Sequence, residues 1–195
     1  MAKILKGFYP NFKIHKVCPN DDLRPEMGYV FFKDGNAYAT DAHVAIVAQL
    51  STISNFTDEE KKLLEGKMIH ATQFAKLLTM RNIDIEFVGE KLCFYCTTSA
   101  GETVILPLLD EETIGRFPNV ERVITEAEKS AKEEKEPINR VGLNACLLAD
   151  LASAINAEFM HFYFGRVNHA IVVRNKEYPE IRAIIMPAMI DNPKF

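Results

Sequence analysis

The chain repeats one order of expected elements, and this repetition limits the folds open to it more than any single motif does. A short strand at Lys67–His70 leads into an amphipathic helix at Ala71–Met80. Three strands follow, at Ile83–Phe87, Lys91–Thr97 and Thr103–Leu109. The same order returns later as a strand at Ile138–Leu143, a helix at Ala145–Ile155 and strands at Glu158–Phe164, His169–Arg174 and Ile181–Met186. Hairpin-linked strands pair antiparallel, so we expect an α+β fold in which strand–helix–three-strand units form antiparallel sheets with helices on one face.

The stretch Gly28–Leu50 precedes these units and is predicted to be a ribbon with one tight turn. Asp34-Gly35 supplies the turn, because glycine accepts the positive φ that a two-residue hairpin needs. The second arm, Asn36–Leu50, is apolar except for one polar interruption. On a continuous strand, Asp41 and His43 in that interruption share one face.

Two segments flank the ribbon. Phe12–Val17 alternates like a strand, and the opening region is a candidate third unit that lacks a recognisable helix. After the ribbon, Thr57 and Glu60 have the spacing of a capping box, which predicts a short helix that ends at Gly66.

The composition changes in the middle of the chain. Phe117–Ile124 is expected to be an extended connector. Thr125–Glu136 is almost entirely charged or small, which is typical of a solvated helix or a flexible linker. We therefore expect residues 125–137 to link two parts of the molecule.

The overall composition is that of an ordinary globular protein, with 48% hydrophobic and 26% charged residues. The formal net charge is −4, so any nucleic-acid binding has to come from a local basic surface. No apolar run reaches the length of a membrane span, and the N-terminus has no signal-peptide core. We expect no membrane association and a cytoplasmic setting.

Four cysteines are present, and two of them, Cys93 and Cys96, have CxxC spacing. No second pair stands at zinc-site distance, and the two fall within an expected strand, where positions three apart face opposite sides. We expect buried structural thiols here, and neither a metal nor another cofactor.

Several stretches, taken in order, resemble the β subunit of bacterial DNA polymerase III, the family of DNA sliding clamps. The family's middle domain typically has an RP-x-x-x-G-V segment, a DG hairpin, a TDGHRLA motif and an FPDYRRV connector, and its third domain has a GFNxxYLL segment and a terminal VVMPMRL. The matching stretches are Arg24-Pro25-Glu26-Met27-Gly28-Tyr29, Asp34-Gly35-Asn36, Thr40-Asp41-Ala42-His43-Val44-Ala45, Phe117-Pro118-Asn119-Val120-Glu121-Arg122-Val123, Gly142-Leu143-Asn144-Ala145-Cys146-Leu147-Leu148 and Ala183-Ile184-Ile185-Met186-Pro187-Ala188-Met189-Ile190. Ala42 and Val44 stand where the family has a glycine and an arginine.

The resemblance implies a shortened, divergent member with the DNA-clamp (processivity) fold. Residues 1–124 resemble the middle clamp domain, residues 125–137 are the charged linker, and residues 138–195 resemble the end of the third domain. The first clamp domain and the first half of the third have no counterpart.

The resemblance also implies a non-catalytic accessory subunit of a DNA polymerase, with two kinds of binding surface. Family members form rings around duplex DNA and dock peptides from polymerases and other partners in a hydrophobic cleft. The positions that match the cleft are Thr40, His43, Val44, Ala45, Pro118, Arg122, Val123, Met186, Pro187 and Met189. The first full helix offers Lys76 and Arg81, with His70 beside it, as the candidates to face DNA without reading its sequence. A homo-oligomer is expected, because a ring needs several copies of a chain this short.

Two alternatives remain open at this point. The second helix carries Asp150 and no basic residue, which favours an adaptor that keeps the peptide cleft but does not encircle DNA. A small hydrolase is the other alternative, with Asp41 orienting the imidazole of His43. No nucleophile stands in a strand–turn–helix elbow and no phosphate-binding glycine loop occurs, so the sequence supports this alternative least.

Overall fold

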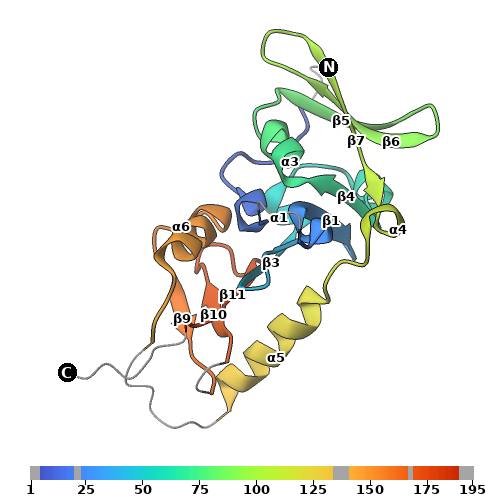
Figure 1. The fold of residues 1–195 in the computed structure, drawn as a ribbon. Helices are drawn as coiled ribbons and strands as arrows, with labels where there is room; N and C mark the ends of the chain where they lie inside the picture. Colours follow the sequence, from blue (N-terminus) through green and yellow to red (C-terminus); the bar gives the residue numbers. More distant parts are fainter. Residues whose placement is uncertain (1–4, 20–22, 134–140, 167–168, 189–195) are drawn as a thin grey trace.

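A computed structural model describes residues 5–19, 23–133, 141–166 and 169–188. Within these residues the strands form two antiparallel sheets. The large sheet has the order β8-β4-β1-β2-β3-β11-β10-β9, and the small sheet has the order β5-β6-β7 (Figure 1). The strands are β1 Tyr29–Lys33, β2 Asn36–Thr40, β3 Val44–Gln49, β4 Lys67–His70, β5 Asn82–Val88, β6 Lys91–Thr97, β7 Thr103–Pro107, β8 Leu109–Asp110, β9 His161–Tyr163, β10 Ile171–Arg174 and β11 Arg182–Ile185. The helices are α1 Leu50–Ile53, α2 Asp58–Leu63, α3 Ala71–Leu77, α4 Glu111–Ile114, α5 Val120–Lys132 and α6 Ala145–Ala154, with 3₁₀ turns η1 Ile14–Val17 and η2 Pro25–Gly28.

The large sheet divides the interior into two cores, because successive side chains along a strand point to opposite faces. In β1, Val30 and Phe32 enter one core and Phe31 enters the other. We call the first the helix-side core, since α3, α6 and η1 close it, and the second the α5-side core. Figure 1 shows α3 and α6 on one side of the sheet and α5 on the other.

Much of the predicted repeat is confirmed, but the strand expected at Ile138–Leu143 is not: residues 138–140 lie outside the described residues, and in residues 141–143 only Gly142 forms an isolated bridge, to Ala188. The unit from β4 through α3 to β7 lies where it was expected, and α6 begins after Asn144, whose side chain accepts hydrogen bonds from the backbone amides of Cys146 and Leu147. The capping box is also confirmed: Glu60 N donates to Thr57 Oγ1 and Thr57 N donates to Glu60 Oε2. The predicted fold class is therefore confirmed, with α5 as an addition on the opposite face.

The strand predicted at Phe12–Val17 is wrong, because this segment forms η1. Lys16 N donates to Lys13 O and Cys18 N donates to His15 O, as in a 3₁₀ turn. Ile14 and Val17 lie three residues apart, one turn of such a helix, and both are buried against α3 and α6. The candidate third unit thus has a 3₁₀ turn where the other two units have an α-helix.

The ribbon prediction is wrong in its second arm, which is two strands joined by a tight turn. Thr40 ends β2, Ala42 has φ of 74°, and Val44 begins β3. Asp41 Oδ1 accepts hydrogen bonds from the backbone amides of His43 and Val44, at 2.8 and 2.7 Å. Asp41 and His43 therefore share no strand face, because the aspartate bonds its own backbone as turn residues do.

The connector prediction is wrong beyond Asn119, where α5 begins. The side chain of Asn119 accepts a hydrogen bond from Arg122 N and caps the helix. Val120, Ile124 and Ala127 recur at helical spacing and enter the α5-side core against β3, β10 and β11. The charged stretch is thus a packed helix as far as Lys132, while residues 134–137 lie outside the described residues. The boundaries predicted for residues 1–124, 125–137 and 138–195 stay a prediction. The pairing of β3, in the first part, with β11, in the last, places strands of both parts in one sheet.

The end of α5 packs closely on the loop that follows β9. A Cβ atom added to Gly165 would lie 2.4 Å from Ser130 Oγ and 3.1 Å from Ser130 Cβ. Arg166 N donates to the same Oγ at 3.2 Å, and the Arg166 guanidinium pairs with Glu133 at 2.9 Å. Only a glycine lets this loop approach the helix so closely.

Replacing Ala42 with glycine should stabilise the protein. Alanine at positive φ costs about 1–2 kcal/mol, and relief of that strain outweighs the roughly 0.5–1 kcal/mol that glycine's flexibility costs. We expect Ala42→Gly to raise the unfolding free energy by about 0.5–1 kcal/mol in urea denaturation. Ala152→Gly, in the regular helix α6, is the matched control and should lose about 1 kcal/mol. Equal losses at both positions would contradict the strain argument.

Replacing Gly165 with alanine should destabilise the packing of α5. The added Cβ overlaps Ser130, so we expect a loss of about 1–3 kcal/mol in unfolding free energy. Gly7→Ala is the control, because its added Cβ would lie 3.5 Å from Ile83, an ordinary contact. Adding Ser130→Ala to Gly165→Ala removes the closest atom, so the double variant should lose less than the sum of the single losses. Strict additivity would argue against this contact.

Candidate functional site

A shallow groove runs along one flank of α5, and we call it the α5–β11 groove. Its volume is about 580 Å³. Apolar atoms of Val123, Ala127, Ala170 and Met186 line it. Its polar lining residues are Glu126, Lys129, Ser130, Glu133, Arg166 and His169. An apolar strip with a charged rim suits a short peptide that inserts one or two apolar side chains.

Three separate parts of the chain build this groove. Val123 projects from α5 and is 45% exposed. Met186 follows the last residue of β11, and its amide donates to His43 O at 2.7 Å, which continues the pairing of β11 with β3. Ala170 precedes β10, the next strand of the sheet. The sheet register therefore decides which side chains meet here.

The structure brings two of the predicted cleft residues, Val123 and Met186, into this groove. Thr40, Val44 and Ala45 lie beneath it or within the cores, at 2–5% exposure, so their side chains offer almost no surface to a ligand. Thr40 Oγ1 donates to Val44 O and accepts from Ala42 N, which holds the turn.

The other predicted cleft residues that the structure describes do not line the groove. His43 and Arg122 are exposed, and Arg122 Nε donates to Glu126 at 2.8 Å. Pro187 is half-buried next to Met186, and Met189 lies outside the described residues. Pro118 lines a different cavity.

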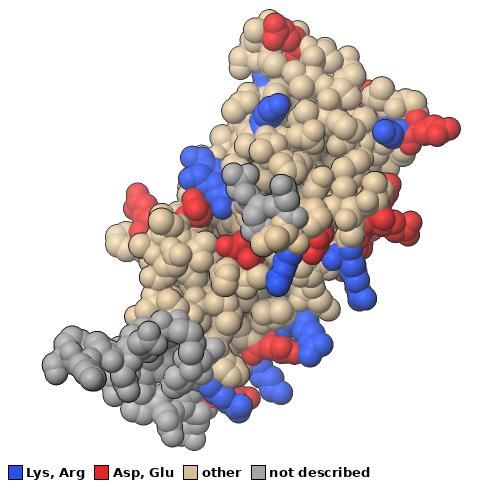
Figure 2. Space-filling view, viewed as in Figure 1, with Lys and Arg blue, Asp and Glu red and all other residues tan. Residues whose placement is uncertain are grey.

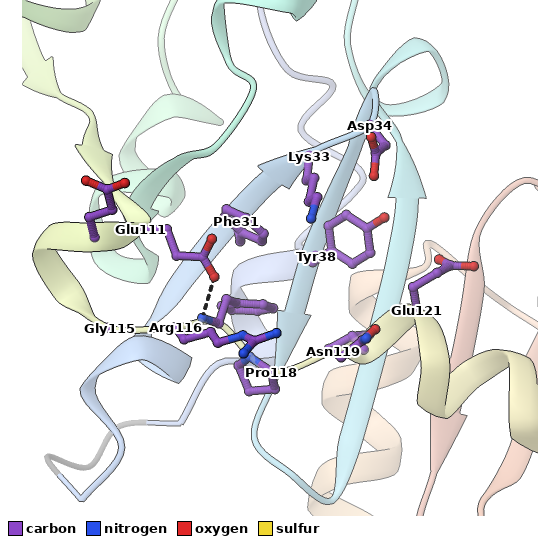
Figure 3. A pocket seen from close by; sticks show the side chains of 13 residues that line it. Phe31, Lys33, Asp34, Tyr38, Glu111, Gly115, Arg116, Pro118, Asn119 and Glu121 are labelled. Atoms are coloured by element: carbon purple, nitrogen blue, oxygen red, sulfur yellow. Dashed lines mark hydrogen bonds between the residues drawn. The ribbon is translucent and has the colours of Figure 1, made fainter.

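That second cavity, of about 620 Å³, lies at the N-terminal end of α5 (Figure 3). Phe31, Tyr38 and Phe117 are its aromatic lining residues. Glu111 Oε1 accepts a hydrogen bond from Phe117 N at 2.8 Å, the dashed line in Figure 3. Burial raises the pKa of the Tyr38 hydroxyl. Sequence reasoning missed this cavity, since its walls come from β1, β2 and the α4–α5 loop.

On the opposite flank of α5 lies a group of ion pairs, Glu121, Glu128, Arg174 and Arg182, which we call the Glu128 cluster. Arg182 binds the Glu128 carboxylate through two nitrogens, with Nε–Oε1 at 2.9 Å and Nη2–Oε2 at 3.1 Å. Arg174 also donates to Glu128, and Arg182 donates to Glu121. Burial alone would raise the pKa of Glu128, but the two arginines outweigh it and hold this pKa below its usual range.

Two of the candidate DNA-facing residues, Lys76 on α3 and Arg81 just after it, lie on the helix side of the large sheet, while the His70 ring packs against Tyr29. Lys76 and Arg81 are exposed, whereas the His70 ring caps α3 by accepting from Thr72 N. Sequence reasoning missed Lys13 and Lys16, which are exposed at η1, because that segment was predicted to be a strand. The three-residue spacing of Ile14 and Val17 was the available signal for a 3₁₀ turn.

The charges on this side do not form one continuous basic surface. Lys16 lies 3.8 Å from Asp150 of α6, which partly offsets it. On the face seen in Figure 2, basic and acidic side chains are interspersed. The exposed cations on the helix side are Lys13 and Lys16 at η1, Lys76 on α3 and Arg81 just after it.

Neither a metal-binding cluster nor a membrane-spanning helix is found among the described residues. No group of three or more His, Cys, Asp or Glu side chains there could hold a metal ion. Cys93 and Cys96 are both buried, and burial raises the pKa of the Cys96 thiol to about 12. No helix in the described ranges has the length and apolar character to cross a bilayer.

The comparison with solved structures identifies one fold. No protein-family model and no curated protein matches the chain. Among solved structures, the beta sliding clamp of C. crescentus matches with a TM-score of 0.62 and 15% identity over 97% of this chain and 66% of that one. The Helicobacter pylori beta clamp gives 0.61 and 13% over 95% and 66%, and the Bartonella birtlesii DnaN clamp bound to griselimycin gives 0.59 and 15% over 91% and 64%. The chain thus spans slightly less than two thirds of these clamps, and it has the fold of the bacterial sliding clamps, the beta subunits of DNA polymerase III.

Proposed function

We propose that this protein is a non-catalytic, sliding-clamp-like processivity factor that docks peptide segments of a DNA polymerase or its partners in the α5–β11 groove. One observation carries the proposal. Val123 and Met186 come from distant stretches and were both expected in a peptide cleft, and they line one groove. Both keep exposed apolar surface that a bound side chain can cover.

The second part of the proposal is that several copies of the chain assemble around duplex DNA or lie along it. Within the described residues, β9 ends the large sheet and β7 ends one side of the small sheet, so each offers an edge strand to another copy. On the other side of the small sheet, β5 is partly covered, since Ile83 N donates to Lys6 O. Lys13, Lys76 and Arg81 supply phosphate-binding charge on the helix side. Contacts to phosphates alone would let the assembly slide.

An adaptor that does not encircle DNA is the second candidate. The observation in its favour is α6, which carries Asp150 and no basic residue between Ala145 and Ala154. Asp150 also offsets Lys16. A helix layer this poor in cations would bind a polyanion weakly, while the peptide groove on the other side of the sheet would keep its role.

Peptide docking predicts that trimming Met186 weakens binding. A fluorescent peptide with adjacent leucine and phenylalanine side chains should bind the full chain, and Met186→Ala should raise its Kd about fivefold to thirtyfold, the loss of one buried apolar anchor. Fluorescence anisotropy measures this. Ile105→Ala, which trims an exposed apolar side chain on β7 outside the groove, is the control and should leave Kd unchanged. Equal affinity of Met186→Ala and wild type would count against the groove.

DNA binding predicts a salt-dependent affinity for duplexes of any sequence. Filter binding at low salt should detect a complex that weakens as salt rises, and Lys13→Gln combined with Lys76→Gln should reduce the salt slope by about 2. Lys33→Gln, on the α5 side of the sheet, should leave the slope unchanged. A flat, negligible signal at low salt would contradict DNA binding and favour the adaptor.

Light scattering tests the assembly: a stable monomer would contradict a ring.

A further inference from the structure

The two flanks of α5 face opposite ends of the strands beneath it. Glu128 lies on one flank and meets Arg182, the first residue of β11. Val123 lies on the other flank, in the α5–β11 groove, where Met186 follows the last residue of the same strand. At about 3.3 Å per residue, Arg182 and Met186 are about 13 Å apart along the strand. One helix therefore connects the Glu128 cluster to the groove.

The geometry of the Glu128 cluster restrains α5 from rotating about its axis. The guanidinium of Arg182 meets the Glu128 carboxylate with two hydrogen bonds, and this fork fixes the relative orientation of the two groups. Arg174, on the neighbouring strand, binds the same carboxylate. The side chains of Glu128, Arg174 and Arg182 are only 21–25% exposed, so water screens these pairs less than pairs on the surface.

The shape of the groove depends on where α5 sits. Val123, Glu126, Ala127 and Ser130 form one wall, and all four belong to this helix. The other wall, with Ala170 and Met186, belongs to the sheet and the segments next to it. A rotation or shift of α5 moves the first wall relative to the second, so it changes the space open to a ligand.

We propose that the Glu128 cluster positions the peptide groove: Arg182 and Arg174 hold α5 in the orientation that presents Val123 and Ala127 to a bound peptide. The coupling rests on the proposed function of the groove. Arg182 lies outside the groove and acts through α5, so it is a positioning residue.

The test compares Arg182→Gln with Lys6→Gln in the full chain. Lys6 pairs with Glu60 at 2.7 Å, with side chains 29% and 15% exposed, and neither residue lines the groove, so it is a matched ion pair. Arg182→Gln should raise the Kd of the leucine–phenylalanine peptide at least about fivefold, the lower end of typical coupling between sites. Lys6→Gln should change it less than twofold. Glu128→Gln should have a non-additive effect with Arg182→Gln, because both remove the same pair.

Hydrogen exchange of α5 amides separates positioning from a general loss of stability. In the absence of peptide, Arg182→Gln should speed the exchange of residues 123–130 at least tenfold relative to wild type, and α3 should exchange as before. Weaker binding with unchanged exchange in α5 would overturn the positioning role. If Arg182→Gln does not fold, Arg174→Gln, which keeps the fork between Arg182 and Glu128, gives the same comparison.

The possible failures can be told apart. A wild-type protein that binds no peptide would overturn the function of the groove and the coupling with it. Wild-type binding that a folded Arg182→Gln variant retains in full would overturn the coupling alone.

Discussion

The large sheet is apolar on both faces, and the rest of the structure depends on covering both. In β3, Val44, Ile46 and Ala48 enter the helix-side core while Ala45 and Val47 enter the α5-side core. Burying one valine or isoleucine contributes about 1.5–3 kcal/mol, so a bare face would forfeit much of the stability of a domain this size. Helices α3 and α6 with η1 cover one face, and α5 has to cover the other.

The need to cover this second face explains why a strongly charged segment forms a packed helix. The stretch after Asn119 is mostly Glu, Lys and small residues, yet Val120, Ile124 and Ala127 form a narrow apolar stripe. The charged residues beside that stripe lie over opposite ends of the strands beneath α5. Glu128 binds arginines at one end, and Glu126 and Lys129 border the groove at the other. A helix too narrow to cover the whole face leaves grooves along its sides, and a binding surface on this fold follows from that incomplete cover.

The local signals of the sequence predicted what local chemistry controls. The capping box at Thr57 and Glu60, the N-cap at Asn144 and the Asp34-Gly35 turn are all present. The errors at Phe12–Val17, at Asp41 and beyond Asn119 share one cause. In each case short alternation or composition favoured one backbone state, and tertiary packing or a side chain bonding its own backbone selected another.

The sequence by itself determined the order of the elements, the two-sided apolar strands and the resemblance to sliding clamps, since these depend on residue type and spacing along the chain. It also placed Val123 and Met186 together through that resemblance. Only the tertiary structure decided that Thr40 and Val44 are buried, that Lys13 and Lys16 join the helix side, and that α5 connects an ion cluster to a groove. The physical reason is that the pairing of β3 with β11 and the seating of α5 set these neighbours, and both join residues far apart in the chain.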